Sequence, residues 1–240
     1  YQTLARFGLT QEMIEDLPMR VLEEIGRGGY SPVLPVRVTD ENGETIESRS
    51  RFAFIRMESG AVDVVFYPAL KSSPLERYDE NQQKQLLEGK TIIADVEMAD
   101  GRCSKSFVQI DEGTKQVMYV PTPIIARNLK VLAGMMHLGT VEVNGMQHGE
   151  PLTVAVEGEP VTVGIDLHNK TGIRFCAGDA QKWKEQPKRE WDKYTFGCYG
   201  CWVMDDDGNL DYVPEEEDTE ELWNDQKKSG ERNRAAGLHK

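Results

Sequence analysis

Residues 79–120 read DENQQKQLLEGKTIIADVEMADGRCSKSFVQIDEGTKQVMYV and contain the signals of one complete helix-and-sheet unit. Asp79 or Asn81 can cap the start of a short helix, because a side-chain oxygen there accepts from free backbone N–H groups. Gly89 can end that helix, since glycine tolerates the left-handed conformation of a helix stop. Two further glycine-containing turns divide the remaining residues into three strand-like segments. We therefore expect a short helix and then three antiparallel strands over residues 91–98, 104–110 and 116–120.

The same order of signals is found on both sides of this stretch. Apolar residues recur at helical spacing over residues 1–25, and a helix stop follows at Gly26. A second apolar stripe runs from Ile125 to Met136 and ends at Gly139. Strand-like segments come after each stop. They cover residues 33–38, 51–57 and 61–67 in the first case, and residues 140–143, 152–156, 161–167 and 172–175 in the second.

These recurring signals predict an α+β fold of tandem small modules, each a short helix followed by an antiparallel β-meander. A meander must bury one of its faces, and its own helix is the nearest cover. We expect N-terminal helices plus a meander over residues 1–77, a second module over 78–122 and a third over 123–180. Residues 181–240 have a different composition and form an aromatic and acidic C-terminal segment.

The net charge of −13 is concentrated in one block. Residues 205–225 contain eleven acids and neither lysine nor arginine, whereas the rest of the chain is nearly neutral. This balance argues against a nucleic-acid binder with a basic face and against electrostatic docking on an anionic membrane. Basic residues flank the block at 182–193 and 227–240. The acids should therefore either pair with these flanks or present one discrete docking site.

The four cysteines and the absence of a long apolar run predict a cytoplasmic protein. A secreted domain of this size that relied on disulfides would usually carry more cysteines. No stretch approaches the roughly 18 apolar residues of a membrane span, and no signal-peptide pattern is present. The chain begins at Tyr1, which leaves open whether residues precede it.

Cys198-x-x-Cys201 is the weak candidate for a metal site. A structural zinc site needs four ligands, usually as two such pairs, and Cys103 and Cys176 are distant and unpaired in the sequence. A redox pair would follow a strand and open a helix, whereas this segment is strand-like and punctuated by glycines. We expect small buried thiols and no cofactor. Zinc is the alternative if the fold gathers all four cysteines, and redox chemistry is a further one.

No motif singles out a catalytic residue. Val163–Leu167 is similar to the first phosphate segment of actin-like ATPases, but the glycine-rich turn of that family does not follow, so a hairpin turn is favoured. The four histidines are scattered, and none belongs to a familiar catalytic motif. A site assembled from remote residues stays open, because catalytic residues need not be adjacent in sequence.

Residues 181–202 alternate aromatic and basic side chains and are the best binding candidate. Aromatic residues with interleaved cations can anchor a protein interface or stack on nucleic-acid bases. In the alternative interpretation, the tryptophans fasten this segment to the modules while the cations pair with the acidic block. The candidate interaction residues are Trp183, Trp191, Tyr199, Trp202, Glu215, Glu216 and Glu217.

Several segments resemble families of unknown function that are carried by conjugative transposons and other mobile elements of gut Bacteroidetes. The segments are Leu9–Ile14, Ser31–Val36, Tyr78–Lys90 and Phe107–Ile110. The resemblance covers roughly residues 1–175, and such families often repeat the helix-then-Gly-Lys opening in tandem. It implies a mobile-element context and a cytoplasmic location. It implies no activity, so no catalytic residue is carried over from it.

Together these observations favour a non-enzymatic accessory protein of a mobile genetic element that acts through protein–protein interaction. One alternative, suggested by the acidic block, is an acidic decoy or inhibitor of a DNA-binding defence or restriction factor. Another is an enzyme whose site is not visible in the sequence. We expect an unidentified protein partner and neither direct nucleic-acid binding nor membrane association.

Overall fold

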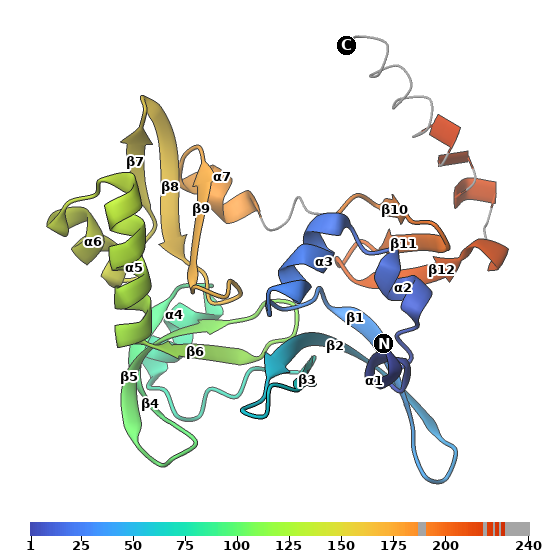
Figure 1. Cartoon of the computed structure of the whole chain (residues 1–240). Coiled ribbons are helices and arrows are strands. Elements are labelled where there is room, and N and C mark those ends of the chain that lie inside the picture. Colours follow the sequence, from blue (N-terminus) through green and yellow to red (C-terminus); the bar gives the residue numbers. More distant parts are fainter. Residues whose placement is uncertain (187–190, 218–219, 223, 226, 229–240) are drawn as a thin grey trace. The chain divides into compact units, whose positions relative to one another are not determined.

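The computed structural model describes residues 1–186, 191–217, 220–222, 224–225 and 227–228 (Figure 1). The described chain forms two compact units. The first unit contains residues 1–26, 31–66 and the described residues after 190. The second contains residues 27–30 and 67–186. The first unit therefore combines the two ends of the sequence.

The α+β prediction is confirmed, because the described residues form short helices and four antiparallel three-stranded sheets. In every sheet the strands succeed one another in sequence order, as in a meander. The strands are β1 Leu34–Thr39, β2 Thr45–Arg56, β3 Val62–Pro68, β4 Ile92–Glu97, β5 Cys103–Ile110, β6 Val117–Pro121, β7 Leu152–Val156, β8 Glu159–Ile165, β9 Ile173–Ala177, β10 Tyr194–Phe196, β11 Gly200–Met204 and β12 Leu210–Pro214.

At least one helix precedes each sheet in the sequence. The helices are α1 Gln2–Ala5, α2 Gln11–Glu15, α3 Met19–Gly26, α4 Glu80–Leu87, α5 Thr122–Met136, α6 Thr140–Gln147, α7 Ala180–Glu185 and the short 3₁₀ helix η2 Glu215–Glu217. Asp79 caps α4 in a complete capping box with Gln82, as the sequence predicts. The division of the chain into modules at residues 77, 122 and 180 stays a prediction.

One expectation about an individual element is wrong. The strand expected over residues 140–143 is the first half of helix α6. Its valines favour strands locally, but Val143 and Met146 lie three residues apart and pack on the same core, while Val141 is 82% exposed. The aromatic C-terminal segment also contains a further helix-then-meander run, α7 and then β10–β12.

The core of the first unit joins the N-terminal helices to two sheets (Figure 1). Phe52 of β2 and Trp202 of β11 are fully buried in the same cluster as Leu9 and Ile14. The indole N–H of Trp202 donates a 3.1 Å hydrogen bond to the carbonyl oxygen of Met13. A buried tryptophan thus finds both an apolar environment and a partner for its polar atom.

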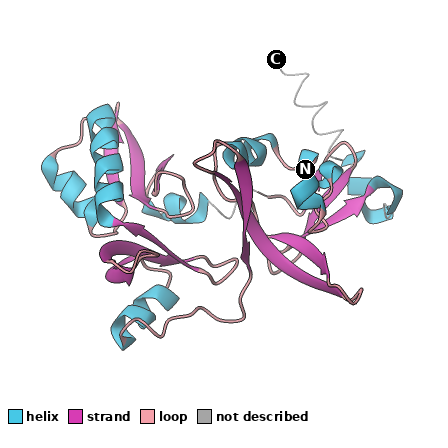
Figure 2. Cartoon of the chain, turned by 60° about the horizontal axis from the view of Figure 1, so that its bottom comes forward, coloured by secondary structure: helices cyan, strands magenta, loops and turns pink. Residues whose placement is uncertain are grey.

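In the second unit, the β4–β6 sheet is covered on both faces. Alternate residues of β4 and β5 pack with Leu86 of α4, whereas Phe107 of β5 points to the opposite face and packs with Ile125 and Leu129 of α5. That second cluster continues into the β7–β9 sheet. Figure 2 shows α5 and α6 lying against one face of β7–β9. Because successive side chains of a strand point to opposite faces of the sheet, β4 and β5 supply apolar side chains to both clusters.

Candidate functional site

A buried carboxylate in the first unit fixes the loop that carries the predicted interaction residues. Asp16 follows α2 and accepts hydrogen bonds from the backbone N–H groups of Cys198, at 2.5 Å, and Tyr199, at 3.0 Å. It also accepts a 2.5 Å bond from the hydroxyl of Tyr212 in β12. Burial and the Asp16 carboxylate raise the pKa of Tyr212 well above its usual range, so the phenol stays a donor. We call this set of three hydrogen bonds the Asp16 clasp.

Gly197 lets the loop approach this carboxylate closely. A Cβ atom added at Gly197 would lie 2.0 Å from Cγ of Asp16, so any other residue there would displace the carboxylate. The backbone N–H of Gly197 donates to the carbonyl oxygen of Gly200 at 2.9 Å and closes the turn between β10 and β11. The loop is therefore held from within by this turn and from outside by the clasp.

The side chain of Tyr199 projects from this fixed loop. The residue as a whole is 47% exposed to solvent. The negative charge of Glu15 is the main cause that raises the pKa of Tyr199, with burial and the charges of Asp16 and Glu12 adding to it. The carbonyl oxygen of Tyr199 accepts a 3.0 Å bond from the N–H of Glu215, which starts the exposed helix η2. We call Tyr199 together with Glu12, Glu15, Glu215, Glu216 and Glu217 the Tyr199 surface.

The acids of the Tyr199 surface lack cationic partners within the described part of the chain. Other acids of the 205–225 block have partners. Asp211 pairs with Arg49 at 3.0 Å, and Glu221 accepts from the hydroxyl of Tyr194 and lies 3.7 Å from Lys193. Asp205 binds backbone groups of its own turn. The expected pairing with the basic flank is thus seen for Lys193, while Lys188, Arg189, Asp218 and residues 229–240 lie outside the described residues.

The predicted interaction residues divide into packing residues and exposed ones. Trp202 is fully buried, and Trp191 is partly buried against the same core. The indole of Trp183, in the second unit, donates to the carbonyl oxygen of Arg174 at 2.8 Å, and the Arg174 guanidinium lies 3.9 Å from the ring centroid. Tyr199 and the three glutamates of η2 are exposed. A partner can therefore reach these four without any rearrangement of the core.

The two cysteines of the CxxC pair differ in environment. Cys201 is buried in β11, as expected, whereas Cys198 is exposed, because it lies in the tight turn that faces Asp16 with its backbone. Cys103 and Cys176 belong to the second unit. Across the described residues, no group of three or more His, Cys, Asp or Glu side chains is placed to hold a metal ion. A zinc role for this pair stays a prediction.

The second unit contains a partly buried ionic cluster that has no signal in the sequence. His168 lies between two carboxylates, with Nε2 3.1 Å from Asp111 and Nδ1 2.9 Å from Asp166. Arg174 Nε lies 2.7 Å from the other oxygen of Asp166. Burial opposes both charges, but the carboxylates outweigh it and raise the pKa of His168 to about 9. In the same way, His168 and Arg174 lower the pKa of Asp166 to about 2 against the effect of burial.

This cluster joins two hairpins rather than presenting a base to a substrate. Asp111 follows β5, while Asp166 and His168 lie in the β8–β9 turn. Gln109 supports the same junction, because its amide donates to Ile165 O at 2.8 Å and accepts from Leu167 N at 2.8 Å. A histidine that donates from both ring nitrogens has no free lone pair, so it does not abstract a proton near neutral pH.

Comparison with known proteins identifies one family domain. Residues 1–78 match the family model described as "Protein of unknown function (DUF4099)". The matched segment contains α1–α3 and β1–β3 and ends before α4. No curated protein and no solved structure shows a significant match to the chain. Among the described helices, none has the length and apolar character needed to cross a bilayer.

Proposed function

We propose that this chain is a cytoplasmic, non-enzymatic accessory protein of a mobile genetic element that acts by binding another protein through the Tyr199 surface. The mobile-element context is supported by the sequence resemblance alone, and the cytoplasmic location by the resemblance and the small number of cysteines. The binding role is supported by the geometry of the first unit. The observation that carries it is the exposed ring of Tyr199 on a loop that is hydrogen-bonded at both its N–H and its C=O.

A fixed exposed tyrosine is well suited to anchor an interface. Tyrosine contributes a large apolar face and a hydroxyl, and it is enriched among the residues that dominate binding energies. Because the Asp16 clasp already orders the loop, binding costs little further backbone entropy. The preorganised loop thus favours recognition by a partner without refolding.

The charge around Tyr199 indicates the chemistry of the partner surface. The five glutamates of the Tyr199 surface are exposed to solvent, two on α2 and three on η2. A partner segment with lysine or arginine would complement them, and such complementarity steers association and selects among partners. The same charges repel phosphate, so direct nucleic-acid binding is disfavoured.

The two alternative functions have less support. A protein that mimics DNA needs carboxylates spaced like phosphates over an extended surface. Several acids of the 205–225 block instead form hydrogen bonds or ion pairs within the protein. An enzyme needs a reactive group, and the most perturbed histidine is held as a cation by two carboxylates. The first feature argues against the decoy, and the second favours a binding protein over a catalyst.

The proposal is tested by comparative affinity purification from the native host with the tagged chain. The variants are Tyr199→Ala and a triple Glu215→Gln, Glu216→Gln, Glu217→Gln variant. Tyr119→Ala is the matched control, because Tyr119 is an exposed tyrosine of the second unit at 44% exposure. We expect one protein to be retained by the wild type and the control and lost from both surface variants. A set of captured proteins that does not differ among the four chains would contradict the proposal.

A further inference from the structure

We propose that the second unit also binds a small amphipathic carboxylate, a ring or branched apolar group with a short chain that ends in –COO⁻. The site is a cavity of about 340 Å³ bounded by β4, β5, the start of α5 and the end of α6. It lies wholly within the second unit and is separate from the Tyr199 surface.

The apolar part of the cavity is a consequence of the strand register. Ile93 and Phe107 are direct cross-strand partners and so lie on the same face of the sheet. Pro123 and Ala126 of α5 complete the apolar lining. Both are short side chains, which leaves room above the Ile93–Phe107 pair where a larger helix residue would fill the space. A volume of about 340 Å³, near the lower end of ligand sites, is enough for a single ring.

The ammonium group of Lys105 at the rim gives the cavity its preference for charge. Lys105 of β5 and His148 at the end of α6 line it, whereas none of its lining residues is a carboxylate. Within the described chain, neither Lys105 nor His148 takes part in an ion pair. Asp95 stands opposite Lys105 in the β4–β5 ladder, but it does not line the cavity. An apolar lining with a lysine ammonium beside it is complementary to an amphipathic monoanion.

The charge of Lys105 also limits the chemistry of the ligand. An uncharged analogue would lose the charge-assisted hydrogen bond to the Lys105 ammonium, and such bonds are about twice as strong as neutral ones. A cationic analogue would meet like charge at the rim. The inferred order of affinity is therefore carboxylate, then amide, then amine, for one and the same apolar group.

The test uses the full chain and 3-phenylpropionate as the probe, with 3-phenylpropanamide and 3-phenylpropylamine as charge analogues. Binding is followed by isothermal titration and by chemical-shift changes of backbone amides. We expect a Kd in the micromolar to millimolar range for the carboxylate, at least fivefold weaker binding of the amide, and shifts centred on β4, β5 and the start of α5.

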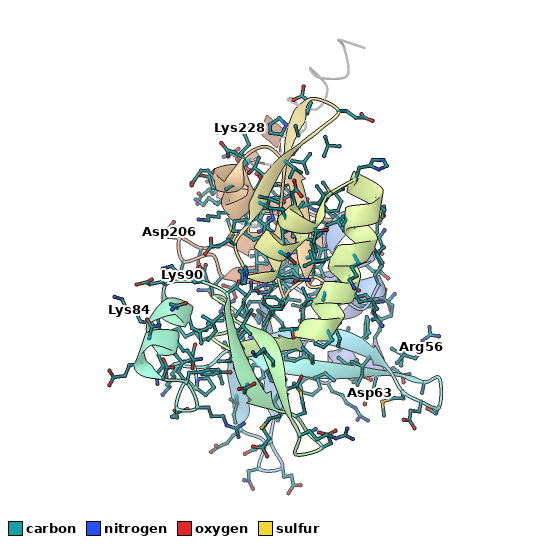
Figure 3. All side chains as sticks on the ribbon, turned by 90° about the vertical axis from the view of Figure 1, so that its left-hand side faces the viewer. Arg56, Asp63, Lys84, Lys90, Asp206 and Lys228 are labelled. Atoms are coloured by element: carbon teal, nitrogen blue, oxygen red, sulfur yellow. The ribbon has the colours of Figure 1, made fainter. Side chains whose placement is uncertain are left out.

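Two variants locate the site. Ala126→Trp should fill the cavity and abolish binding, and Lys105→Gln should weaken the carboxylate about five- to tenfold while leaving the amide unchanged. Lys84→Gln is the control, since Lys84 projects outward from α4, away from the cavity (Figure 3). No carboxylate binding by the wild type, or equal binding of acid and amide, would overturn the proposal. If Ala126→Trp unfolds the protein, the shift map decides, because shifts centred outside β4, β5 and α5 would likewise overturn it.

Discussion

The carboxylate of Asp16 accepts a 2.5 Å hydrogen bond from the hydroxyl of Tyr212, 196 positions later in the chain. This bond links the end of helix α2 to strand β12 and belongs to the Asp16 clasp. The DUF4099 match covers residues 1–78, and the first unit, which holds residues 1–26 and 31–66 of that range, also includes the described residues after 190. Closure of the first unit by this bond has consequences for stability that can be measured.

Asp16→Asn should destabilise the first unit. The amide of asparagine can accept fewer charge-assisted bonds than a carboxylate, and its NH₂ group would face backbone donors. We expect a loss of about 1.5–3 kcal/mol in the free energy of unfolding, measured by urea denaturation. Asp206→Asn is the control, because Asp206 is exposed in the β11–β12 turn (Figure 3). Equal stability of the two variants would show that the clasp contributes nothing.

The isolated segment of residues 1–78 should not form a stable native core. Its buried cluster would lack Trp202 and Leu210, which pack against Leu9 and Phe52 in the whole chain. Removing a fully buried tryptophan alone costs about 3–5 kcal/mol, a large share of the stability of a small domain. Heteronuclear NMR of the fragment should show poor dispersion, and adding residues 190–240 on a linker should restore it. A well-dispersed spectrum of residues 1–78 alone would contradict this expectation.

Stability of the second unit should fall at mildly alkaline pH because of His168. Its pKa is raised from 6.5 when unfolded to about 9 when folded, so the folded state binds the extra proton. The stabilisation is fully present below pH 6.5 and is lost as the pH rises through 9. His168 is partly exposed, so we expect a loss on the order of 1–2 kcal/mol. Unfolding midpoints measured from pH 6 to 10 should decline in the wild type and stay flatter in His168→Gln.

Protonation of Asp166 should lower the stability of the second unit at acidic pH. Its pKa is lowered from 3.8 to about 2 by His168 and Arg174. This contribution is present above pH 3.8 and disappears as the pH falls through 2. A side-chain carboxyl NMR titration of the wild type should place Asp166 near the lower value. A titration midpoint near 4 would show that the ionic cluster does not form in solution.

A pair of glycine substitutions tests the packing of the second unit. A Cβ at Gly164 would lie 2.5 Å from the ring of Trp183, whereas a Cβ at Gly145 in α6 meets no atom within 4 Å. Gly164→Ala should cost about 1–3 kcal/mol through overpacking. Gly145→Ala should instead stabilise the helix by about 0.5–1 kcal/mol, because alanine has the higher helix propensity. Thermal unfolding of both variants gives the comparison, and a shift in the same direction for both would contradict it.

Local signals account for most of the elements, while long-range contacts account for the sites. The cap at Asp79 and the stop at Gly89 could be read from the sequence because they depend on neighbouring residues. The strand expected at 140–143 was wrong because burial of Met146 outweighs the strand propensity of the valines. The Asp16 clasp could not be predicted, since two of its donors are backbone N–H groups about 180 positions away. Asp111 and His168 likewise come from separate hairpins.

The exposed face of Tyr199 is tested most directly by site-specific photo-crosslinking in the native host. A photoreactive phenylalanine analogue replaces Tyr199 in one chain and Tyr119 in another, and cross-linked proteins are identified by mass spectrometry. A protein-binding role predicts one dominant partner that cross-links from position 199 and not from position 119. Its yield should fall when Glu215, Glu216 and Glu217 are changed to glutamine. The same set of proteins from both positions, or none from position 199, would contradict the proposed function.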